Sequence, residues 1–379
     1  MKELIVKASL LEDGLVDEVK KMIEENRKLF ENETVVLMAD AHKGKDVPVG
    51  FTMTLSNGLV PPSFVSADIG CGMSSILIED YVPSNSELYA FNMIARDVIQ
   101  VNKRLENGSL TDLGTLGNGN HFVEIGTNGK DTLITVHSGS RSFGGKTFKI
   151  HMEEAKKQHS ERMFKVSKEE LETIEPKLRQ AYIKNKKTNA INPTIPYIDL
   201  NIYGYDNYLK EMNEAIQYAQ KNRNKILQNV YDSLCDINPN VFMKFIKIHS
   251  CIHNYIEFKS DKEMILRKGS INADTENTVI IPINMRDGII LGVSKNTEKV
   301  NFSLPHGGGR VLSRTKAFAE LDLETFKKDM EGVFSPSVNQ NTLDESPRAY
   351  KDIKTILKDI EPYLEEYQIF KPLFNFKGE

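Results

Sequence analysis

The chain has 379 residues, 40% hydrophobic and 27% charged, with a net charge of −4 at pH 7. This composition excludes a disordered chain and a protein that coats nucleic acid through an overall positive charge. Three cysteines are too few for a disulfide framework, no apolar run reaches the roughly 18 residues of a membrane span, and no secretory signal is visible, so we expect a cytoplasmic protein without a membrane partner.

The N-terminal half alternates strand-like and helix-like patterns. The first 35 or so residues predict a short strand and then an amphipathic helix, with Val16, Val19, Ile23 and Leu29 on its apolar side. Apolar runs between glycine- and proline-containing turns predict strands at Val35–Leu37, Thr52–Leu55 and Ser75–Ile78. A helix over Ser86–Arg104 and a glycine-rich turn at Gly114–Asn120 should precede strands at Phe122–Ile125 and Leu133–Val136.

The second half begins with a region, residues 145–230, that we expect to be mostly helical. Ser167–Glu170 has the form of a capping box, and Pro176 should end or kink the helix that begins there. A later helix should bury one face, formed by Leu209, Met212, Ile216 and Ala219. Strands are expected from Val241 to Phe302, and helices over Phe318–Met330 and Ile353–Tyr367.

The candidate site residues are scattered from position 40 to 377, and no linker rich in Gly, Ser or Pro divides the chain. We therefore predict one domain over residues 1–379 of the α+β class, with central β-sheets flanked by helices. The helical region near 145–230 would be an insertion in it.

Cysteine and histidine side chains supply the first chemical pattern. Cys71 lies between two glycines, which allow a tight turn that presents its sulfur together with the carboxylate of Asp68. A thiolate there could bridge two cations, or Cys71 could be a buried structural cysteine. Five of the eight histidines lie in turns flanked by glycine or asparagine: His42, His121, His137, His253 and His306.

The turn at Gly117–Asn120 leads into a predicted strand. On a strand His121 and Val123 face one side, while Phe122 and Glu124 face the other. His121 would then point to a metal, and Glu124 would contact a nucleobase or ribose. A glycine-rich hairpin with polar edge residues is the alternative.

Two further segments suggest phosphate chemistry. His137 ends an apolar strand, and Arg141 follows it with a fork of donors suited to a phosphate, or simply at the surface of a turn. Three glycines follow His306, so backbone N–H groups can approach a ligand closely, with Arg310 and Arg314 next in the chain. A histidine there can attack phosphorus to form a phosphoramidate. The alternative is a flexible glycine loop.

In this order, these segments resemble the RtcB family of RNA-splicing ligases over most of the chain. The matching motifs are Met38–His42 with Gly44-Lys45, Asp68–Met73, Gly114–Gly117 leading to Asn120-His121, His137–Arg141, His253–Tyr255, Arg267–Gly269, His306-Gly307, Asp344-Glu345 with Pro347, Ala349–Ile353 and Lys377-Gly378. The resemblance implies an RtcB-like fold and GTP- and manganese-dependent joining of RNA 3′-phosphate or 2′,3′-cyclic phosphate ends to 5′-hydroxyl ends, in RNA repair or tRNA splicing. An accessory activating protein is a further partner that it allows.

The resemblance also implies a role for each matching residue. His306 would be the nucleophile that is transiently guanylylated. Two Mn²⁺ ions, sharing Cys71, would be bound by Asp68, Cys71, His121, His137 and His253. The GTP site would comprise Asn120, His121, Phe122, Val123, Glu124, His253, Asn254, Pro282, Ile283, Asn284, Met285, His306, Gly307, Gly308, Gly309 and Lys377. RNA or phosphate contacts would come from Arg141, Arg310 and Arg314.

Two features depart from a simple reading of the resemblance. Cysteine and histidine ligands on their own favour zinc, so manganese is expected from the resemblance alone. Family members usually carry Pro-Gly-Ser-Met-Gly where Pro282–Arg286 reads Pro-Ile-Asn-Met-Arg, and Ile289 replaces a serine. Because isoleucine adopts a positive φ only with strain, we expect a reshaped nucleotide loop and a divergent branch devoted to RNA repair. Two other functions stay open: a metal-dependent RNA cyclic phosphodiesterase and a non-catalytic protein that binds RNA ends.

Overall fold

Two β-sheets form the centre of the computed structural model, which describes residues 1–101, 103–104, 110–111, 113–164, 166–189, 195–260 and 263–378. The five-stranded sheet has the order β1 (Glu3–Val6), β2 (Thr34–His42), β3 (Val49–Leu55), β13 (Glu263–Lys268), β12 (Asn254–Ser260). Only the β1–β2 pair in it is parallel among the described strands.

The seven-stranded sheet is antiparallel throughout its described pairs. Its order is β11 (Ile246–Ile252), β5 (Gly72–Ile78), β9 (Thr132–Ser138), β8 (Phe122–Thr127), β18 (Leu364–Lys377), β16 (Gly288–Ser294), β15 (Thr278–Asn284). Three short pairs join β14 (Ser270–Asn272) to β17 (Ser303–Pro305), β10 (Ile198–Asp199) to β4 (Leu59–Val60), and β6 (Lys103–Arg104) to β7 (Leu110–Thr111). Sheets with flanking helices confirm the expected α+β class.

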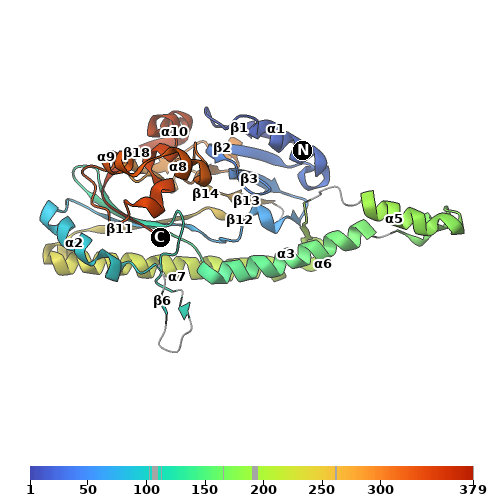
Figure 1. The fold of residues 1–379 in the computed structure, drawn as a ribbon, viewed down its shortest axis with the longest axis horizontal. Helices are drawn as coiled ribbons and strands as arrows, with labels where there is room; N and C mark the ends of the chain where they lie inside the picture. The colour runs from blue at the N-terminus through green and yellow to red at the C-terminus, as the bar shows by residue number, and fades with distance from the viewer. Residues whose placement is uncertain are drawn as a thin grey trace.

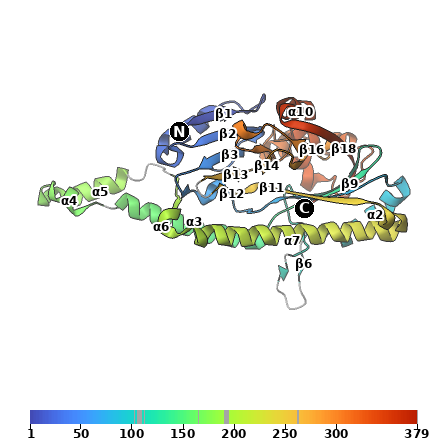
Figure 2. The same ribbon diagram turned by 180° about the vertical axis from the view of Figure 1, so that it is seen from behind.

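Helices lie on both sides of the sheets (Figures 1 and 2). α7 runs beneath them, α8 to α10 lie above, and α4 and α5 extend away from the body. No described helix is long and apolar enough to cross a membrane. The helices are α1 (Leu15–Glu25), α2 (Asn85–Val98), α3 (Arg141–Phe164), α4 (Lys168–Glu172), α5 (Arg179–Asn189), α6 (Leu200–Tyr203), α7 (Tyr205–Ile237), α8 (Arg314–Glu320), α9 (Leu323–Asp329) and α10 (Ile353–Ile360).

α7 supports the strand ends from which the site is built. It buries Leu209, Met212 and Ala219 on the predicted face, and Ile216 is partly buried. The buried guanidinium of Arg223 donates to the carbonyl oxygens of Gly70 (2.8 Å) and Ser138 (2.9 Å). These bonds satisfy the arginine donors and fix the chain at the start of β5 and the end of β9.

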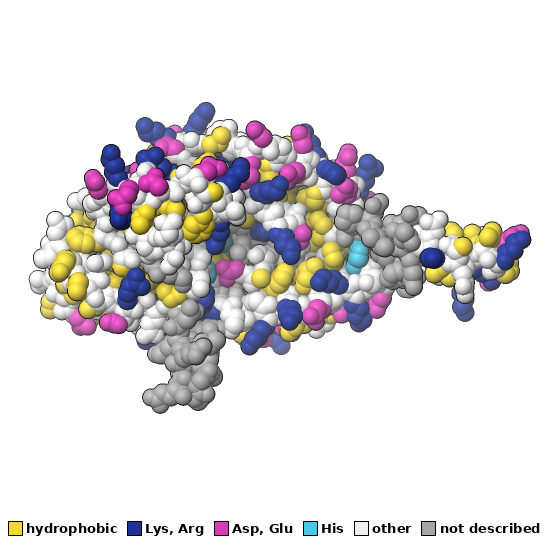
Figure 3. Space-filling model, in the orientation of Figure 1, with side chains coloured by type: hydrophobic (Ala, Val, Ile, Leu, Met, Phe, Trp, Pro, Cys, Tyr) yellow, Lys and Arg dark blue, Asp and Glu magenta, His cyan; other side chains and the backbone are white. Residues whose placement is uncertain are grey.

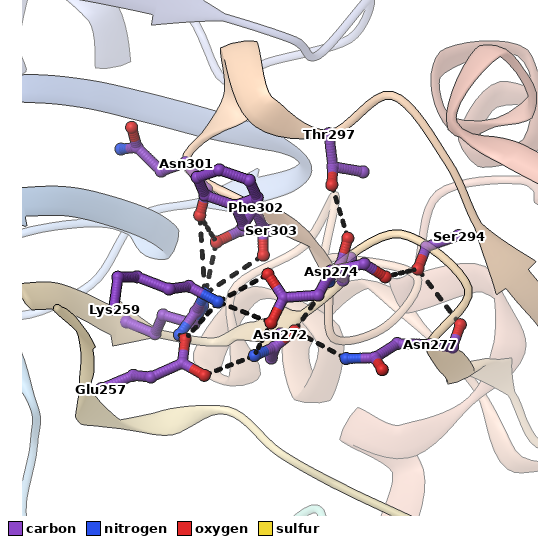
Figure 4. Close-up of polar contacts among 12 residues, drawn as sticks. Glu257, Lys259, Asn272, Asp274, Asn277, Ser294, Thr297, Asn301, Phe302 and Ser303 are labelled. Atoms are coloured by element: carbon purple, nitrogen blue, oxygen red, sulfur yellow. Dashed lines mark hydrogen bonds and ion pairs between the residues drawn. The ribbon is translucent and has the colours of Figure 1, made fainter.

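A polar network fixes the approach to His306 (Figure 4). The fully buried Arg267 pairs with Glu257 (2.6 Å) and donates to the hydroxyl of Ser303 (2.9 Å). Lys259 in turn pairs with Asp274 (2.5 Å). Strand β17 is thereby held in place immediately before His306.

Several predicted boundaries were wrong because tertiary hydrogen bonds override local pattern. The helix expected over Ser86–Arg104 ends at Val98, and Lys103–Arg104 forms β6. The carbonyl groups of Gln100 and Val101 instead accept hydrogen bonds from Leu116 and Gly117. This pairing attaches the chain to the glycine-rich turn.

The C-terminal helix was also predicted too long. α10 ends at Ile360, a 3₁₀ turn covers Glu361–Tyr363, and β18 begins at Leu364. Pro362 cannot donate to a continuing helix, and the residues after it pair with β16. Residues 241–243 form a 3₁₀ turn before β11, and the helix over Phe318–Met330 is divided into α8 and α9, with Asp322 capping α9.

The helical region near 145–230 is confirmed as α3, α4, α5 and α7. Ser167 caps α4 through the N–H of Glu170 (3.0 Å), as the capping motif predicts. α4 ends at Glu172, and Pro176 begins a 3₁₀ turn.

Phe374 offers a test of this packing, because it joins β18 to α2. Its fully buried ring meets Phe91 edge-to-face at 5.0 Å between centroids. We expect Phe374→Ala to lower the free energy of unfolding in urea by about 3–5 kcal/mol through the cavity that it leaves. Phe258→Ala, at a side chain that is 52% exposed, should change it by less than about 0.5 kcal/mol. Equal losses would contradict this packing.

Candidate active site

Four strand ends and connections bring the five predicted metal ligands together. Cys71 precedes β5, His121 precedes β8, and His137 lies near the end of β9. Asp68 comes from the loop before β5, and His253 joins β11 to β12. Segments far apart in the chain therefore meet where neighbouring strands of the seven-stranded sheet begin or end.

Cys71, His121 and His137 form a compact donor group. The Cys71 sulfur lies 3.2 Å from Nε2 of His137 and 3.5 Å from Nε2 of His121, and the three ligand atoms lie within 4.8 Å of one another. Oδ2 of Asp68 is 3.2 Å from Nε2 of His121. The ring of His253 lies 5.1 Å from that of His137 between centroids.

The surroundings of these ligands suit a divalent cation. Burial lowers the pKa values of His137 and His253 well below their usual range, so these imidazoles are neutral and have a lone pair for a cation. Burial also raises the pKa of the Cys71 thiol, so the thiolate needs the charge of a bound cation to form. Nδ1 of His137 faces the carbonyl oxygen of Asn120 at 3.1 Å, which directs Nε2 to the Cys71 side. Nδ1 of His253 is buried and has no hydrogen-bond partner among the described residues. A sulfur, three imidazoles and a carboxylate fit a metal ion.

His306 continues this row of imidazoles, with its ring 4.6 Å from that of His253. Its Nδ1 lies 2.6 Å from Oδ2 of Asp40, a carboxylate on β2 that is fully buried. The same oxygen accepts the backbone N–H groups of His306 (3.1 Å) and Gly307 (3.2 Å). Asp40 therefore holds Nδ1 as a donor and leaves Nε2 with a free lone pair.

Asp40 and His42 both lie in the segment Met38–His42 that carried the resemblance, but neither was assigned a catalytic, metal-binding or nucleotide-binding role from the sequence. The available signal was a carboxylate in an otherwise apolar strand. Burial lowers the pKa of His42, whose ring lines the cavity beside His306.

A cavity of about 460 Å³ opens beside His306 (Figure 3 shows this face hollowed, with lysine and arginine side chains around the hollow). This volume falls in the usual range for small-molecule sites. Most residues predicted for the nucleotide line it, namely Asn120, Phe122, Glu124, Pro282, Ile283, Asn284, Met285, His306, Gly307, Gly308, Gly309 and Lys377. Arg310 and Arg314 also line it, as does His137.

Glu124 is a buried carboxyl group in this cavity. Asn375 donates to its Oε2 at 2.8 Å, while Oε1 of Glu124 and Oδ1 of Asn375 have no partner among the described residues. Burial raises the pKa of Glu124 to about 8. Two unpaired acceptors side by side fit a ligand edge that carries N–H groups.

Lys377 and Arg310 meet at the buried Glu345. Lys377 contacts one carboxylate oxygen at 2.8 Å, and Arg310 contacts the other at 3.2 Å. Burial raises the pKa of Glu345, but the two cations outweigh burial and hold that pKa at about 2. Arg310 is thus paired inside the protein, whereas the side chain of Arg314 is 55% exposed at the cavity and 3.7 Å from Asp344.

The glycine loop after His306 packs against protein. A Cβ atom on Gly308 would lie 2.5 Å from the carbonyl oxygen of Ile283, and one on Gly309, at φ +68°, would lie 2.5 Å from that of Asp40. The glycines are therefore needed to bring the His306 loop against β15 and β2. The sequence had suggested instead that they allow backbone N–H groups to approach a ligand closely.

The altered nucleotide loop is a β-hairpin between β15 and β16. Ile283 and Ile289 lie in β15 and β16, neither has a positive φ within the described chain, and both side chains are buried in apolar clusters. Asn284 closes the hairpin by accepting the N–H groups of Arg286 and Asp287. The isoleucines are thus accommodated as strand residues without strain.

Some predicted site residues lie outside the cavity. Val123 points into the core, on the opposite face from Phe122 and Glu124, as strand alternation predicts. The side-chain amide of Asn254 bonds the backbone of Asp68 (3.1 Å) and Gly269 (3.0 Å), so it braces the ligand loop. His121 and His253 belong to the imidazole row, and Arg141 donates to Nδ1 of His121 at 3.3 Å.

Comparison with known proteins gives one consistent result. Residues 78–378 match the family model described as tRNA-splicing ligase RtcB. The chain is 26% identical to RNA-splicing ligase RtcB of Escherichia coli K12, with 96% of this chain and 94% of that protein covered. It is 24% identical to tRNA-splicing ligase RtcB of Aeropyrum pernix (85% and 82% covered) and 24% identical to that of Nanoarchaeum equitans (91% and 89% covered).

Glu124 gives the site a pH signature. The pKa of this carboxyl group is about 8 in the folded protein, against 4.5 for an ordinary glutamate. The folded state therefore binds more protons than the unfolded state over that interval, so stability falls as pH rises through it. Glu124→Gln removes this loss. Relative to the parent protein, the variant should gain at least about 1 kcal/mol in urea unfolding between pH 5 and pH 8. A stability difference that does not change with pH would contradict the assignment.

Proposed function

As this chain belongs to the RtcB family of tRNA-splicing ligases, we propose that it joins RNA 3′-phosphate or 2′,3′-cyclic phosphate ends to 5′-hydroxyl ends through a guanylylated His306. The observation that carries the proposal is the position of His306. Its ring is held by Asp40, touches the imidazole row and lines a nucleotide-sized cavity.

The first step follows from the two nitrogens of His306. Nε2 attacks the α-phosphorus of GTP, a P–N bond forms, and the bond from that phosphorus to the bridging oxygen breaks to release pyrophosphate. The ring becomes cationic, and the carboxylate of Asp40 at Nδ1 stabilises that charge. The fixed orientation also removes the entropy cost of aligning the ring.

Metal binding is assigned to Asp68, Cys71, His121, His137 and His253, and we propose two Mn²⁺ ions there on the strength of the family. Bound divalent cations would neutralise phosphate charge and orient the attacking and leaving groups. The protein contributes neutral, buried imidazoles at His137 and His253, and the backbone carbonyl group of Asn120 orients the ring of His137.

The unpaired acceptors of Glu124 and Asn375 support guanine as the base. Guanine presents N1–H and an exocyclic amine on one edge, and a carboxylate can accept both, whereas adenine offers a different pattern. Donation from the base would stabilise the ionised form of Glu124. Lys377, held over the ring of Phe122 at 5.0 Å, borders the same region.

The remaining steps transfer and displace GMP. An oxygen of the RNA 3′-phosphate attacks the phosphorus of the GMP on His306, and the P–N bond breaks. The RNA 3′-phosphate then carries GMP as a good leaving group. The 5′-hydroxyl attacks that 3′-phosphate and displaces GMP to form the phosphodiester. Arg314 and Arg310 line the cavity where phosphate charge would lie. We assign these steps to one domain comprising residues 1–379, in which the helical region near 145–230 is an insertion, and we propose RNA repair as its setting.

The adduct is the direct test. Incubation with GTP labelled at the α-phosphate and Mn²⁺, followed by denaturing electrophoresis, should give a labelled chain that maps to His306. His306→Ala should give none. Asp40→Asn should slow labelling by about 100-fold or more, because Nδ1 loses its charged partner.

Lys354→Ala on α10 is the matched control and should label as the parent does. Labelling of His306→Ala would contradict the assignment of His306 as the nucleophile. Opening of a cyclic phosphate without GTP, with no adduct under any nucleotide, would favour the phosphodiesterase. Binding of phosphorylated RNA ends without turnover would favour a non-catalytic protein.

Base choice tests Glu124 separately. The parent should label with GTP in preference to ATP, and inosine triphosphate, which keeps N1–H but lacks the amine, should fall between them. Glu124→Gln should reduce the preference for GTP over ATP by roughly tenfold or more, because its amide cannot accept both donors. An unchanged preference would remove Glu124 from base recognition.

A further inference from the structure

A stacked aromatic pair lies beside the metal-ligand group and outside the nucleotide cavity. The ring of Phe143 on α3 lies over that of Tyr218 on α7, with 5.6 Å between centroids and 10° between planes. Phe143 is 37% exposed. It follows Arg141, whose guanidinium contacts His121, by two residues.

The α7 side of this pair lies directly under the ligand loop. A Cβ atom on Gly70 would lie 2.8 Å from the Cα atom of Ile216 and 3.4 Å from the Cβ atom of Ala219, residues on either side of Tyr218. The side chain of Asp68 is 37% exposed, and Asp68 is not among the residues that line the cavity. The ligand group is therefore open to solvent at Asp68 as well as facing the cavity through His137.

The two helices are locally basic where they meet this opening. Residues 141–152 and 215–231 contain no Asp or Glu, although the chain as a whole is acidic. Lys146 on α3 is exposed, as are Lys221 and Lys225 on α7. Lys225 reaches the glycine-rich turn, with its Cγ atom 3.1 Å from a Cβ position on Gly114. Each of the two helices that carry the aromatic pair therefore also carries exposed lysines.

We propose that this α3–α7 face binds the single-stranded RNA next to the reacting end, through Arg141, Phe143, Lys146, Tyr218, Lys221 and Lys225. The exposed ring of Phe143, backed by Tyr218, stacks a nucleobase, and the lysines contact the phosphates that follow it. Aromatic stacking beside a basic track is the chemistry with which proteins hold unpaired nucleic acid without reading sequence. The identification of the ligand as RNA rests on the proposed function.

Binding of a short fluorescent single-stranded RNA with a 3′-phosphate, followed by anisotropy, tests this face. Phe143→Ala should raise Kd about tenfold. Phe143→Tyr should bind as the parent does, whereas Phe143→Leu, which keeps the apolar volume but lacks the ring, should bind as weakly as Phe143→Ala, an outcome that a purely structural role in packing α3 would not give. Lys221→Ala with Lys225→Ala should lower the slope of log Kd against log salt by about 1.4, the share of two phosphate contacts.

Matched controls come from elsewhere on the surface. Phe258→Ala removes an aromatic ring that is 52% exposed on β12. Lys354→Ala with Lys358→Ala removes two exposed lysines from α10, on the opposite side of the sheets from α7 in both views (Figures 1 and 2). Both controls should bind RNA as the parent does. Parent-like affinity and salt slope in the α3–α7 variants would overturn the proposal.

Labelling with GTP in the absence of RNA separates this proposal from the function on which it rests. Phe143→Ala and the double lysine variant should form the GMP adduct at the parent rate, because the cavity is untouched. If the parent forms no adduct but the variants still lose RNA binding, the ligase assignment fails and the RNA face stands. Loss of labelling in Phe143→Ala would place that ring in the catalytic machinery and overturn its role in RNA binding.

Discussion

One carboxylate oxygen holds the candidate active site together. Oδ2 of Asp40 accepts hydrogen bonds from the ring and backbone of His306 and from the backbone of Gly307, and it is fully buried. Lys351 reinforces it, with Nζ bonded to the carbonyl groups of Ala39 (2.8 Å) and Ala41 (3.2 Å). Burial of such charges is tolerated only when they are paired. The orientation of the His306 ring therefore depends on a link between the five-stranded sheet and the loop after β17.

Residue chemistry in short turns was the part of the site that the sequence could reveal. Cys71, His121, His137 and His306 each lie within two residues of glycine or asparagine near a strand end, and the fold brings these ends together. No role could be assigned to Asp40 and Asn375 from the sequence, because the residues that they contact lie more than 250 positions away in the chain. Nothing in their immediate neighbours distinguishes them from ordinary polar strand residues.

The accuracy of the predicted secondary structure also depended on whether local sequence or distant hydrogen bonds determine the conformation of a segment. The face that α7 buries was predicted correctly. The amphipathic helix α1 is present as predicted, but it ends at Glu25, and Leu29 lies in the 3₁₀ turn that follows. The predicted helices continued beyond Val98 and Ile360, where the observed helices end. The residues that follow form backbone hydrogen bonds with Leu116 in the first case and with β16 in the second, and these bonds determine their conformation. Ile283 agrees with the same reasoning, since a residue that adopts a positive φ only with strain lies in an extended strand that buries its side chain.

The position of β18 has a consequence for how the protein is made. This strand lies between β8 and β16, and its end places Lys377 at the cavity beside His306. The ribosome synthesises the partner strand of residues 122–127 about 250 residues later. Until then, the backbone N–H and C=O groups on that edge of β8 have no strand to pair with. Such distant pairing slows folding. A chain still attached to the ribosome before β18 has emerged has no complete cavity, so ligase chemistry begins only after synthesis of this strand is over.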